Sequence, residues 1–205
     1  EFRRVLFRSN RSMQNALIFV FRTLVELYII TFVLRLILQS IRADARNPLV
    51  QFILRVTNPL VVPLRRYVPT AWGFDTATFI VLFVIQALAT TALLNVACTV
   101  TPTVGQIILL SLLRLAHLGL NTYLFLILTY VILSWIGPGG YNPAVSLLGS
   151  IVQPALRPLR RWIPTIAGID LSPLFAFLII TFVMQLLPSG RAITGLACVS
   201  VGGIM

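Results

Sequence analysis

Long apolar runs separated by short polar segments dominate this chain of 205 residues. Four of the runs approach or exceed the ~18 to 20 residues that a helix needs to cross a hydrocarbon core. They cover roughly residues 14–41, 77–100, 107–136 and 171–187. The pattern predicts an all-α, polytopic membrane protein with four transmembrane helices.

Two proline-rich segments join the runs in pairs, one after the first run and one after the third. In the first segment, Pro59, Pro63 and Pro69 are expected to prevent a continuous helix, because proline lacks a backbone N–H and biases the preceding residue toward extended backbone. The stretch LVQFILRV at residues 49–56 is then expected to form only a short interfacial helix.

Local signals also predict how the chain leaves these segments. Ser172 is a candidate N-cap of the fourth run, with Pro173 at its first helical position. Gly73 and Gly168 suit turns that require a positive φ. We therefore expect the two segments to form loops that lie along the lipid headgroups.

One motif is written twice. PLRRYVPTAWGFD at residues 63–75 returns as PLRRWIPTIAGID at residues 158–170, an offset of 95 residues, and the same offset aligns the Asn-Pro pair at residues 47–48 with that at 142–143. So many shared prolines and charges without a gap indicate an internal duplication of a span–loop–span unit. Because each unit holds an even number of spans, we expect parallel repeats with both loops on one face.

The duplication sets the predicted domain organisation. The first repeat covers residues 13–100, a linker covers 101–106, and the second repeat covers 107–188. Residues 1–12 carry four arginines and lack the apolar region and cleavage site of a signal peptide, so they are interpreted as a tag or a disordered tail. Residues 189–205 form a second, unassigned tail.

Composition excludes several classes of function. Hydrophobic residues make up 58% of the chain and charged residues 10%, which is outside the range of soluble domains. The net charge of +11 comes from arginines near the ends of apolar runs, where anionic headgroups meet them, so the bilayer is the expected partner rather than nucleic acid. Cys98 and Cys198 form no C-x-x-C pattern and are interpreted as buried inert thiols, so no metal or cofactor is expected.

The duplicated loops carry the candidate lipid- or partner-binding residues. Their arginines can extend to lipid phosphates, and their aspartates can pair with these arginines or cap the next helix. One interpretation is a surface anchor that sets helix orientation; the other is a recognition surface for anionic lipid or a protein partner. The candidate residues are Arg65, Arg66, Asp75, Arg160, Arg161 and Asp170.

Arginine counts predict the side of the membrane. The two motif loops hold eight arginines against five on the opposite face, and discounting residues 1–12 leaves eight against one. Loops of this length follow the positive-inside rule, so the motif loops are expected in the cytoplasm, with the protein in the bacterial inner membrane.

A second group of polar residues lies inside the apolar runs. The offset of the repeats aligns Arg22 with His117 and Glu26 with Asn121, and Arg114 lies one turn before His117. Residues four apart share a helix face, so two polar seams are expected to meet at the repeat axis. Isolated charges there would cost about 2.5 to 3.5 kcal/mol each, which favours inward-facing pairs. These groups either hold helices together or form an ion or proton path with Glu26 and His117 as titrating groups.

The sequence offers little evidence for catalysis. The chain has one histidine and lacks H-E-x-x-H, G-x-S-x-G and glycine-rich nucleotide loops. Asp75 and Asp170 lie beside arginines before predicted spans, where ion pairing and capping explain them better than an intramembrane hydrolase does. We therefore expect a non-catalytic protein.

The duplicated motif, together with VILSW at residues 131–135 and GIDLSP at 168–173, resembles the YggT family of YlmG-type bacterial proteins and plastid relatives. The resemblance covers roughly residues 14–188, although the first copy reads GFDTAT in place of GIDLSP. It implies an envelope or assembly scaffold, since bacterial members are associated with osmotic stress and cell division and plastid members with cytochrome maturation or nucleoid distribution. Expected partners are division or assembly proteins or a second copy of the chain; the alternative function is a small ion or solute transporter.

Overall fold

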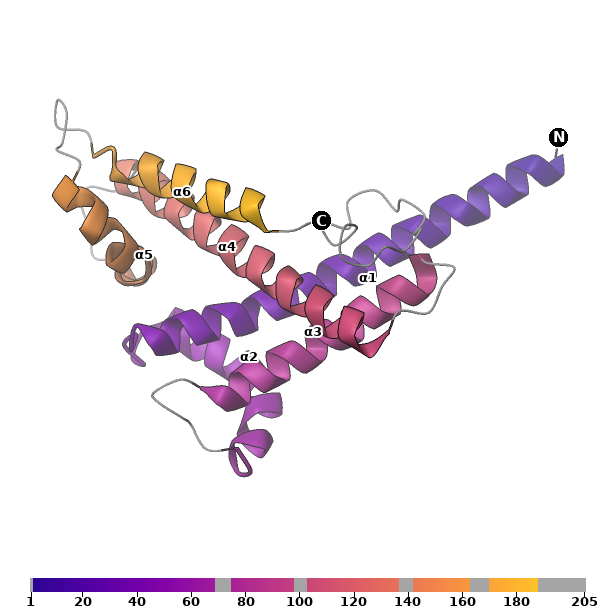
Figure 1. Cartoon of the computed structure of the whole chain (residues 1–205), viewed down its shortest axis with the longest axis horizontal. Helices are drawn as coiled ribbons and strands as arrows, with labels where there is room; N and C mark the ends of the chain where they lie inside the picture. Colours follow the sequence, from indigo (N-terminus) through magenta and orange to yellow (C-terminus); the bar gives the residue numbers. More distant parts are fainter. Residues whose placement is uncertain (1, 69–74, 98–102, 137–141, 163–169, 188–205) are drawn as a thin grey trace.

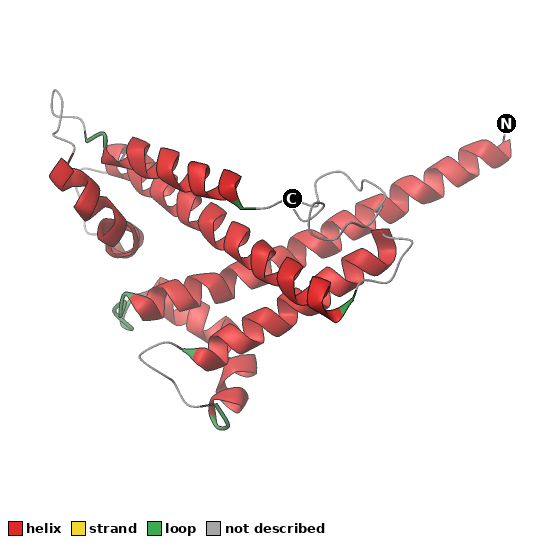
Figure 2. Cartoon of the chain, viewed as in Figure 1, coloured by secondary structure: helices red, strands yellow, loops and turns green. Residues whose placement is uncertain are grey.

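A computed structural model describes residues 2–68, 75–97, 103–136, 142–162 and 170–187. Helices account for most of these residues, and the described part of the chain contains no strand (Figure 2). The all-α prediction is confirmed at this level. The helices are α1 Phe2–Ser40, α2 Pro48–Arg65, α3 Thr76–Ala97, α4 Val104–Ile136, α5 Pro143–Trp162 and α6 Ser172–Leu186.

The two halves of the chain repeat one order of helices. In Figure 1, α1 and α4 run from right to left, and α3 and α6 run back from left to right. The shorter helices α2 and α5 both lie toward the left of this view, and each packs against the two long helices of its own half. The described residues of each motif segment therefore follow the short helix of their own half.

Three helices are long and apolar enough to cross a membrane: Ala16–Ser40 within α1, Thr76–Asn95 within α3 and Val104–Ser134 within α4. The helix α6 has 15 residues. At 1.5 Å per residue it is about 22 Å long, which is shorter than the ~30 Å hydrocarbon core. A multi-pass membrane protein is thus supported, but the prediction of four crossing helices is not confirmed.

The helix α1 extends further than the first apolar run. It begins at Phe2, so the segment that the sequence set apart as a tag or tail is helical. No glycine or proline occurs between Phe2 and Ser40 to interrupt the helix. The helix ends in a turn in which Arg42 adopts a φ of 52° and the N–H of Ala43 donates to the carbonyl of Leu38 at 2.9 Å. This reversal leads the chain toward α2.

The prediction that prolines prevent a continuous helix is wrong. Pro59 and Pro63 lie inside α2, and Pro154 and Pro158 lie inside α5. All four are exposed and spaced four residues apart in each helix, so they share its outer face. Carbonyls that lose a backbone donor there lie near the surface, where water or headgroups can satisfy them, and the helix continues.

The starts of the helices explain the repeated Asn-Pro pair. The side chain of Asn47 accepts a hydrogen bond from the N–H of Leu49 at 2.9 Å and caps α2, and Pro48 occupies the first helical position. Asn142 accepts in the same way from Ala144 at 2.9 Å. Each pair is thus a helix start signal, because proline's missing N–H costs nothing there.

The expectation for the start of α6 is wrong in detail. Ser172 is already helical, and the N-cap position is held by Leu171, which provides no side-chain cap. The carboxylate of Asp170 accepts from the N–H of Ser172 at 2.9 Å instead. A carboxylate can satisfy an orphan helix N–H as well as a serine hydroxyl can, so the capping function moves two residues upstream.

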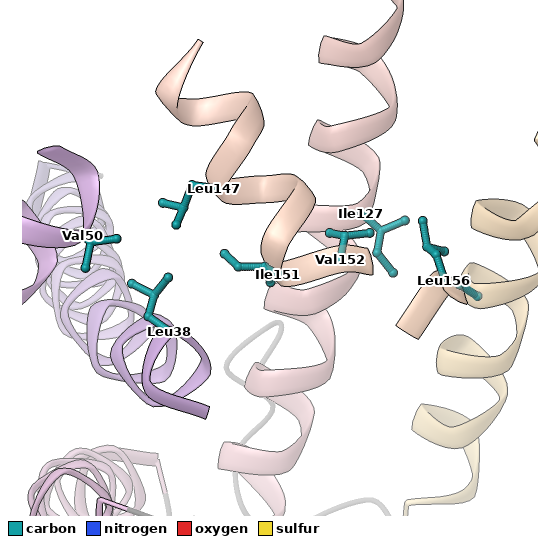
Figure 3. Close-up of a cluster of buried hydrophobic side chains, with 8 residues drawn as sticks. Leu38, Val50, Ile127, Leu147, Ile151, Val152 and Leu156 are labelled. Carbon is teal, nitrogen blue, oxygen red and sulfur yellow. The ribbon is translucent and has the colours of Figure 1, made fainter. Parts of the chain in front are cut away.

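Two apolar clusters hold the helices together. One cluster includes Ile29, Phe32, Val61 and Leu82, and it packs α1, α2 and α3 against one another. The other joins the repeats, because Leu38 and Val50 of the first half face Leu147 and Ile151 of the second half (Figure 3). The second cluster fixes α2 and α5 relative to one another.

Candidate functional site

The two basic elbows are defined by Arg65, Arg66 and Asp75 in the first repeat and by Arg160, Arg161 and Asp170 in the second. In the first elbow, Nη2 of Arg65 lies 2.6 Å from a carboxylate oxygen of Asp75. In the second elbow, Nε of Arg160 lies 2.7 Å from a carboxylate oxygen of Asp170. The predicted pairing of arginine with aspartate is confirmed, and it occurs at equivalent positions in both repeats.

Asp75 is the more enclosed of the two carboxylates, with 4% of its surface exposed. It accepts from the N–H of Thr78 at 3.3 Å and also from the Thr78 hydroxyl, so it caps α3 as well as binding Arg65. Burial raises the pKa of Asp75, but hydrogen bonds from Thr78, Gln39 and Arg65 outweigh burial and hold the pKa below its usual value. The folded protein therefore stabilises the charged form of the Asp75 carboxylate.

Asp170 has a looser environment. Burial raises the pKa of Asp170, while hydrogen bonds from Ser172 and Arg160 and the charge of Arg160 together hold the pKa below its usual value. The position equivalent to Thr78 is Pro173, which has no donor to offer. The second elbow thus keeps the ion pair and loses the hydroxyl that reinforces it in the first.

The other arginine of each elbow is left available. The side chains of Arg66 and Arg161 are exposed, and neither forms a hydrogen bond or ion pair with the residues that the structure describes. The remaining predicted features of the elbows, Pro69, Gly73 and Gly168, lie outside the described residues, as do Cys98 and Cys198. Each elbow therefore presents one paired and one unpaired guanidinium.

Direct contact joins the helices that lead into the elbows. The amide Nδ2 of Asn47 donates to the carbonyl of Pro143 at 2.8 Å, from the start of α2 to the start of α5. Sequence reasoning aligned the Asn-Pro pairs at the two helix starts but did not predict this hydrogen bond between them. The signal was the Asn-Pro pair itself, because an N-cap asparagine keeps its amide free for a second partner.

An apolar groove of about 490 Å³ opens beside the first elbow, between α2 and α3. Its lining includes Pro63 and Tyr67 from the α2 side and Ile80 and Val84 from α3. Tyr67 follows Arg66 directly, so the groove begins at the elbow. Such a surface matches a lipid acyl chain better than water.

A second site lies inside the bundle. The predicted intramembrane residues Arg22, Glu26, Arg114, His117 and Asn121 all line one cavity of about 280 Å³. The cavity is shared by α1, α3, α4 and α6, so it lies between the repeats. Within it, Nε of Arg22 lies 2.8 Å from a carboxylate oxygen of Glu26. The structure brings the two polar seams together at one place.

Two further features of this interior were not predicted. Gln86 of α3 also lines the cavity and donates to the Thr90 hydroxyl at 3.2 Å. The ring nitrogen Nε2 of His117 is buried without a hydrogen-bond partner among the described residues. A glutamine within an apolar run was the available signal for Gln86, and the offset of 95 residues aligns it with Thr181, a polar residue that sequence reasoning did not single out.

Among the residues that the structure describes, Arg35 is the largest fully buried side chain, with 2% of its surface exposed. Its Nη1 donates to the hydroxyl of Thr57 at 2.6 Å and to the side-chain oxygen of Asn58 at 2.9 Å. These bonds tie α1 to α2. Sequence reasoning missed them because residues 57 and 58 were placed in a non-helical loop, whereas they lie on the inner side of α2.

Comparison with known sequences fits this repeated architecture. The sequence profile of the CCB3/YggT family matches residues 14–96 and matches again at 109–190. The chain belongs to the CCB3/YggT family. The two matched segments are offset by 95 residues at their start, the same offset that relates the two basic elbows.

Relatives within the CCB3/YggT family span nearly the whole chain. An uncharacterized protein of Pseudomonas aeruginosa, PA0392, is 39% identical over 90% of this chain and 94% of its own length. An uncharacterized protein in the proC 3′ region of Vibrio alginolyticus is 34% identical over 82% and 91% of the two chains. The YggT protein of Escherichia coli K12 is 34% identical over 81% and 86%. No solved structure matches the chain.

Proposed function

We propose that this CCB3/YggT protein is a non-catalytic membrane scaffold that uses its paired basic elbows to bind anionic lipid headgroups or the acidic surface of a protein partner. The observation that carries the proposal is the joining of the elbow helices by the Asn47–Pro143 hydrogen bond, with equivalent Arg–Asp pairs on both sides. The bond fixes the starts of α2 and α5 relative to one another, and the elbows at the far ends of these two helices act as two equivalent basic sites.

Charge and shape support lipid binding. Arg66 and Arg161 are exposed cations without partners in the described chain, and a basic residue near an anionic membrane contributes about 1 kcal/mol of attraction. The outer face of α2 exposes Leu49, Phe52 and Leu60, which suit insertion at the headgroup boundary. The groove beside Tyr67 extends this apolar surface toward the acyl chains.

The proposal assigns the elbows to the cytoplasmic leaflet of the bacterial inner membrane. Its support is the excess of arginine in the two motif segments, which follows the positive-inside rule. The leaflet on that side carries anionic lipid, so location and chemistry agree. Osmotic stress and cell division, where the resemblance places YggT-like proteins, are the proposed settings for a scaffold of this kind.

The test removes the elbow charges and compares an equal change elsewhere. The variant carries Arg→Gln at positions 65, 66, 160 and 161, and the control carries Arg→Gln at the exposed positions 42, 46, 55 and 157 of the same two segments. Native mass spectrometry from mixed vesicles of phosphatidylglycerol and phosphatidylcholine measures bound lipid, and crosslinking in membranes measures partners. We expect the elbow variant alone to lose anionic-lipid enrichment and partner capture. Equal retention by both variants contradicts the proposal.

A second candidate function is transport of a small ion or solute. The supporting observation is the cavity between the repeats, which contains Glu26, His117 and the Arg22–Glu26 pair. Polar sites near the middle of the membrane at a repeat interface are typical of secondary transporters. Proteoliposome flux assays with the wild type and Glu26→Gln test it: uptake that depends on Glu26 supports transport, and the absence of uptake contradicts it.

A further inference from the structure

The groove beside the first elbow has two walls of apolar side chains. One wall runs from Leu60 to Tyr67, at the end of α2 and in the turn that follows it, and the other runs from Ile80 to Ile85 of α3. Among the lining residues that the structure describes, the hydroxyl of Tyr67 is the one polar side-chain group. The groove therefore offers contact to a hydrocarbon chain along most of its length.

The course of α3 sets the depth of the groove in the membrane. This helix begins at Thr76, directly after Asp75 of the elbow, and it is long and apolar enough to cross a bilayer. At 1.5 Å per residue, the wall from Ile80 to Ile85 lies about 6 to 14 Å from the start of the helix. With the elbow at the level of the headgroups, this wall lies at the depth of the acyl chains.

A basic side chain lies beside the elbow end of the groove. Arg66 follows α2 with helical backbone angles, φ −68° and ψ −28°, so it lies one turn after Pro63, a lining residue. The N–H of Tyr67 donates to the carbonyl of Leu64 at 3.0 Å, which keeps the next lining residue in the same turn. The guanidinium of Arg66 can thus reach a group held at the mouth of the groove.

The charge of Arg66 is available to a ligand. Its side chain is exposed and forms no hydrogen bond or ion pair with the residues that the structure describes. The acid of the elbow, Asp75, is 4% exposed and lies 2.6 Å from Arg65, so its charge is already paired. A cation at one end and an apolar groove leading away from it match an amphiphile with an anionic head.

We propose that the first elbow binds one anionic phospholipid, with Arg66 holding the headgroup phosphate and the groove between α2 and α3 holding an acyl chain. Free phosphate would leave the groove empty, and a zwitterionic lipid would bring a cation of its own toward Arg66. The inference rests on the proposed function in so far as that function includes lipid binding. It goes further by assigning one lipid to one site.

The second repeat closes the same wall at one position. Val81 lines the groove, and the residue aligned with it is Ala176, which is 3% exposed and belongs to the apolar cluster that joins the repeats. Another aligned pair offers a matched control, because Val84 of the groove and Ile179 of α6 are each 49% exposed. A bulky side chain at either position replaces the same amount of exposed surface.

The experiment is photo-crosslinking of the full chain in nanodiscs that contain equal amounts of phosphatidylglycerol and phosphatidylcholine. The probe is a trace of either lipid with the same diazirine-bearing acyl chain, and mass spectrometry locates the label. The quantity measured is the fraction of all label on the chain that falls on residues 60–67 and 80–85. We expect this fraction to be about fivefold higher for phosphatidylglycerol, which is the preference that one basic residue near the membrane surface provides.

Two variants separate the headgroup contact from the chain contact. Arg66→Gln should remove the preference for phosphatidylglycerol, whereas Arg55→Gln should keep it, because Arg55 lies eleven residues earlier in α2 and about 16 Å away along the helix. Val84→Trp should fill the groove and lower its labelling by phosphatidylglycerol to the level of phosphatidylcholine. Its control, Ile179→Trp, should label as the wild type does. If one of the two groove variants fails to fold, the other decides the question.

Equal labelling of the groove by the two lipids in the wild type overturns the inference, and so does a preference that survives in a folded Arg66→Gln or Val84→Trp. The proposed function is tested separately, by total bound lipid and partner capture in the variant that lacks all four elbow arginines. Loss of both in that variant, with unselective labelling of the groove, rejects this inference and keeps the proposed function. Selective labelling, with both retained in that variant, keeps this inference and rejects the proposed function.

Discussion

The carboxylate of Asp75 shows how a single residue serves both the elbow and the helix that follows. It receives hydrogen bonds from Thr78 and Arg65, whereas Asp170 keeps the arginine and lacks the threonine. Because the pKa of each carboxyl is lowered in the folded protein, each contributes stability that is present above the ordinary carboxyl pKa and is lost as the pH falls through the folded pKa.

A pH series tests this residue-level assignment. We expect the melting temperature of the wild type in detergent to fall as the pH decreases below about 4, where an ordinary carboxyl protonates. Asp75→Asn should lose about 2 kcal/mol of unfolding free energy at neutral pH, because buried hydrogen bonds to a charge are lost. Its melting temperature should then fall less than that of the wild type as the pH decreases. Asp170→Asn should lose less, since Asp170 is more exposed. Equal effects of the two substitutions would contradict the assignment.

The helices show which sequence signals were sufficient to predict secondary structure. The three long apolar runs predicted α1, α3 and α4, because a helix that buries its backbone in lipid needs only an uninterrupted apolar sequence. No helix was predicted at α5, and α2 was predicted only as a short piece because Pro59 and Pro63 were treated as helix breakers. Their position on an exposed face, which decides whether a proline is tolerated, depends on tertiary packing.

The starts of α2 and α5 offer a matched pair of substitutions. Asn47 and Asn142 cap equivalent helices, but only Asn47 has a described bond to the other repeat, through the carbonyl of Pro143. Asn142→Ala should cost about 1 kcal/mol for the lost cap. Asn47→Ala should cost about 2 kcal/mol, because a second hydrogen bond is lost as well. Unfolding in graded dodecyl sulfate measures both, and equal losses would show that the link between the repeats contributes nothing.

At the scale of the whole molecule, duplication explains why the two elbows follow equivalent helices in the two halves of the chain. The chain runs along α1 to the first elbow, returns along α3, and runs forward again along α4 to the second elbow (Figure 1). This arrangement does not require the 15-residue helix α6 to cross the membrane. The internal offset was therefore enough to predict that the elbows follow equivalent helices in the two repeats, although the number of crossing helices was not confirmed.

Sequence reasoning predicted most of the polar residues that line the interior site, but not all of them. Spacing of four residues placed Arg22 with Glu26 and His117 with Asn121 on single helix faces. Sequence could not show that α3 contributes Gln86 to the lining, because this depends on how four helices pack. The same holds for Arg35, whose partners lie on a helix that proline appeared to forbid.

Site-directed labelling tests the shared orientation of the repeats most directly. In a variant with Cys98 and Cys198 replaced by serine, single cysteines are placed at Gln51 or Ser146, which are exposed, uncharged and equivalent positions of α2 and α5. A membrane-impermeant maleimide is applied to spheroplasts before and after permeabilisation. The account predicts that both cysteines are protected in intact cells and react together once the membrane is opened. Reaction of one cysteine from outside while the other stays protected would contradict it.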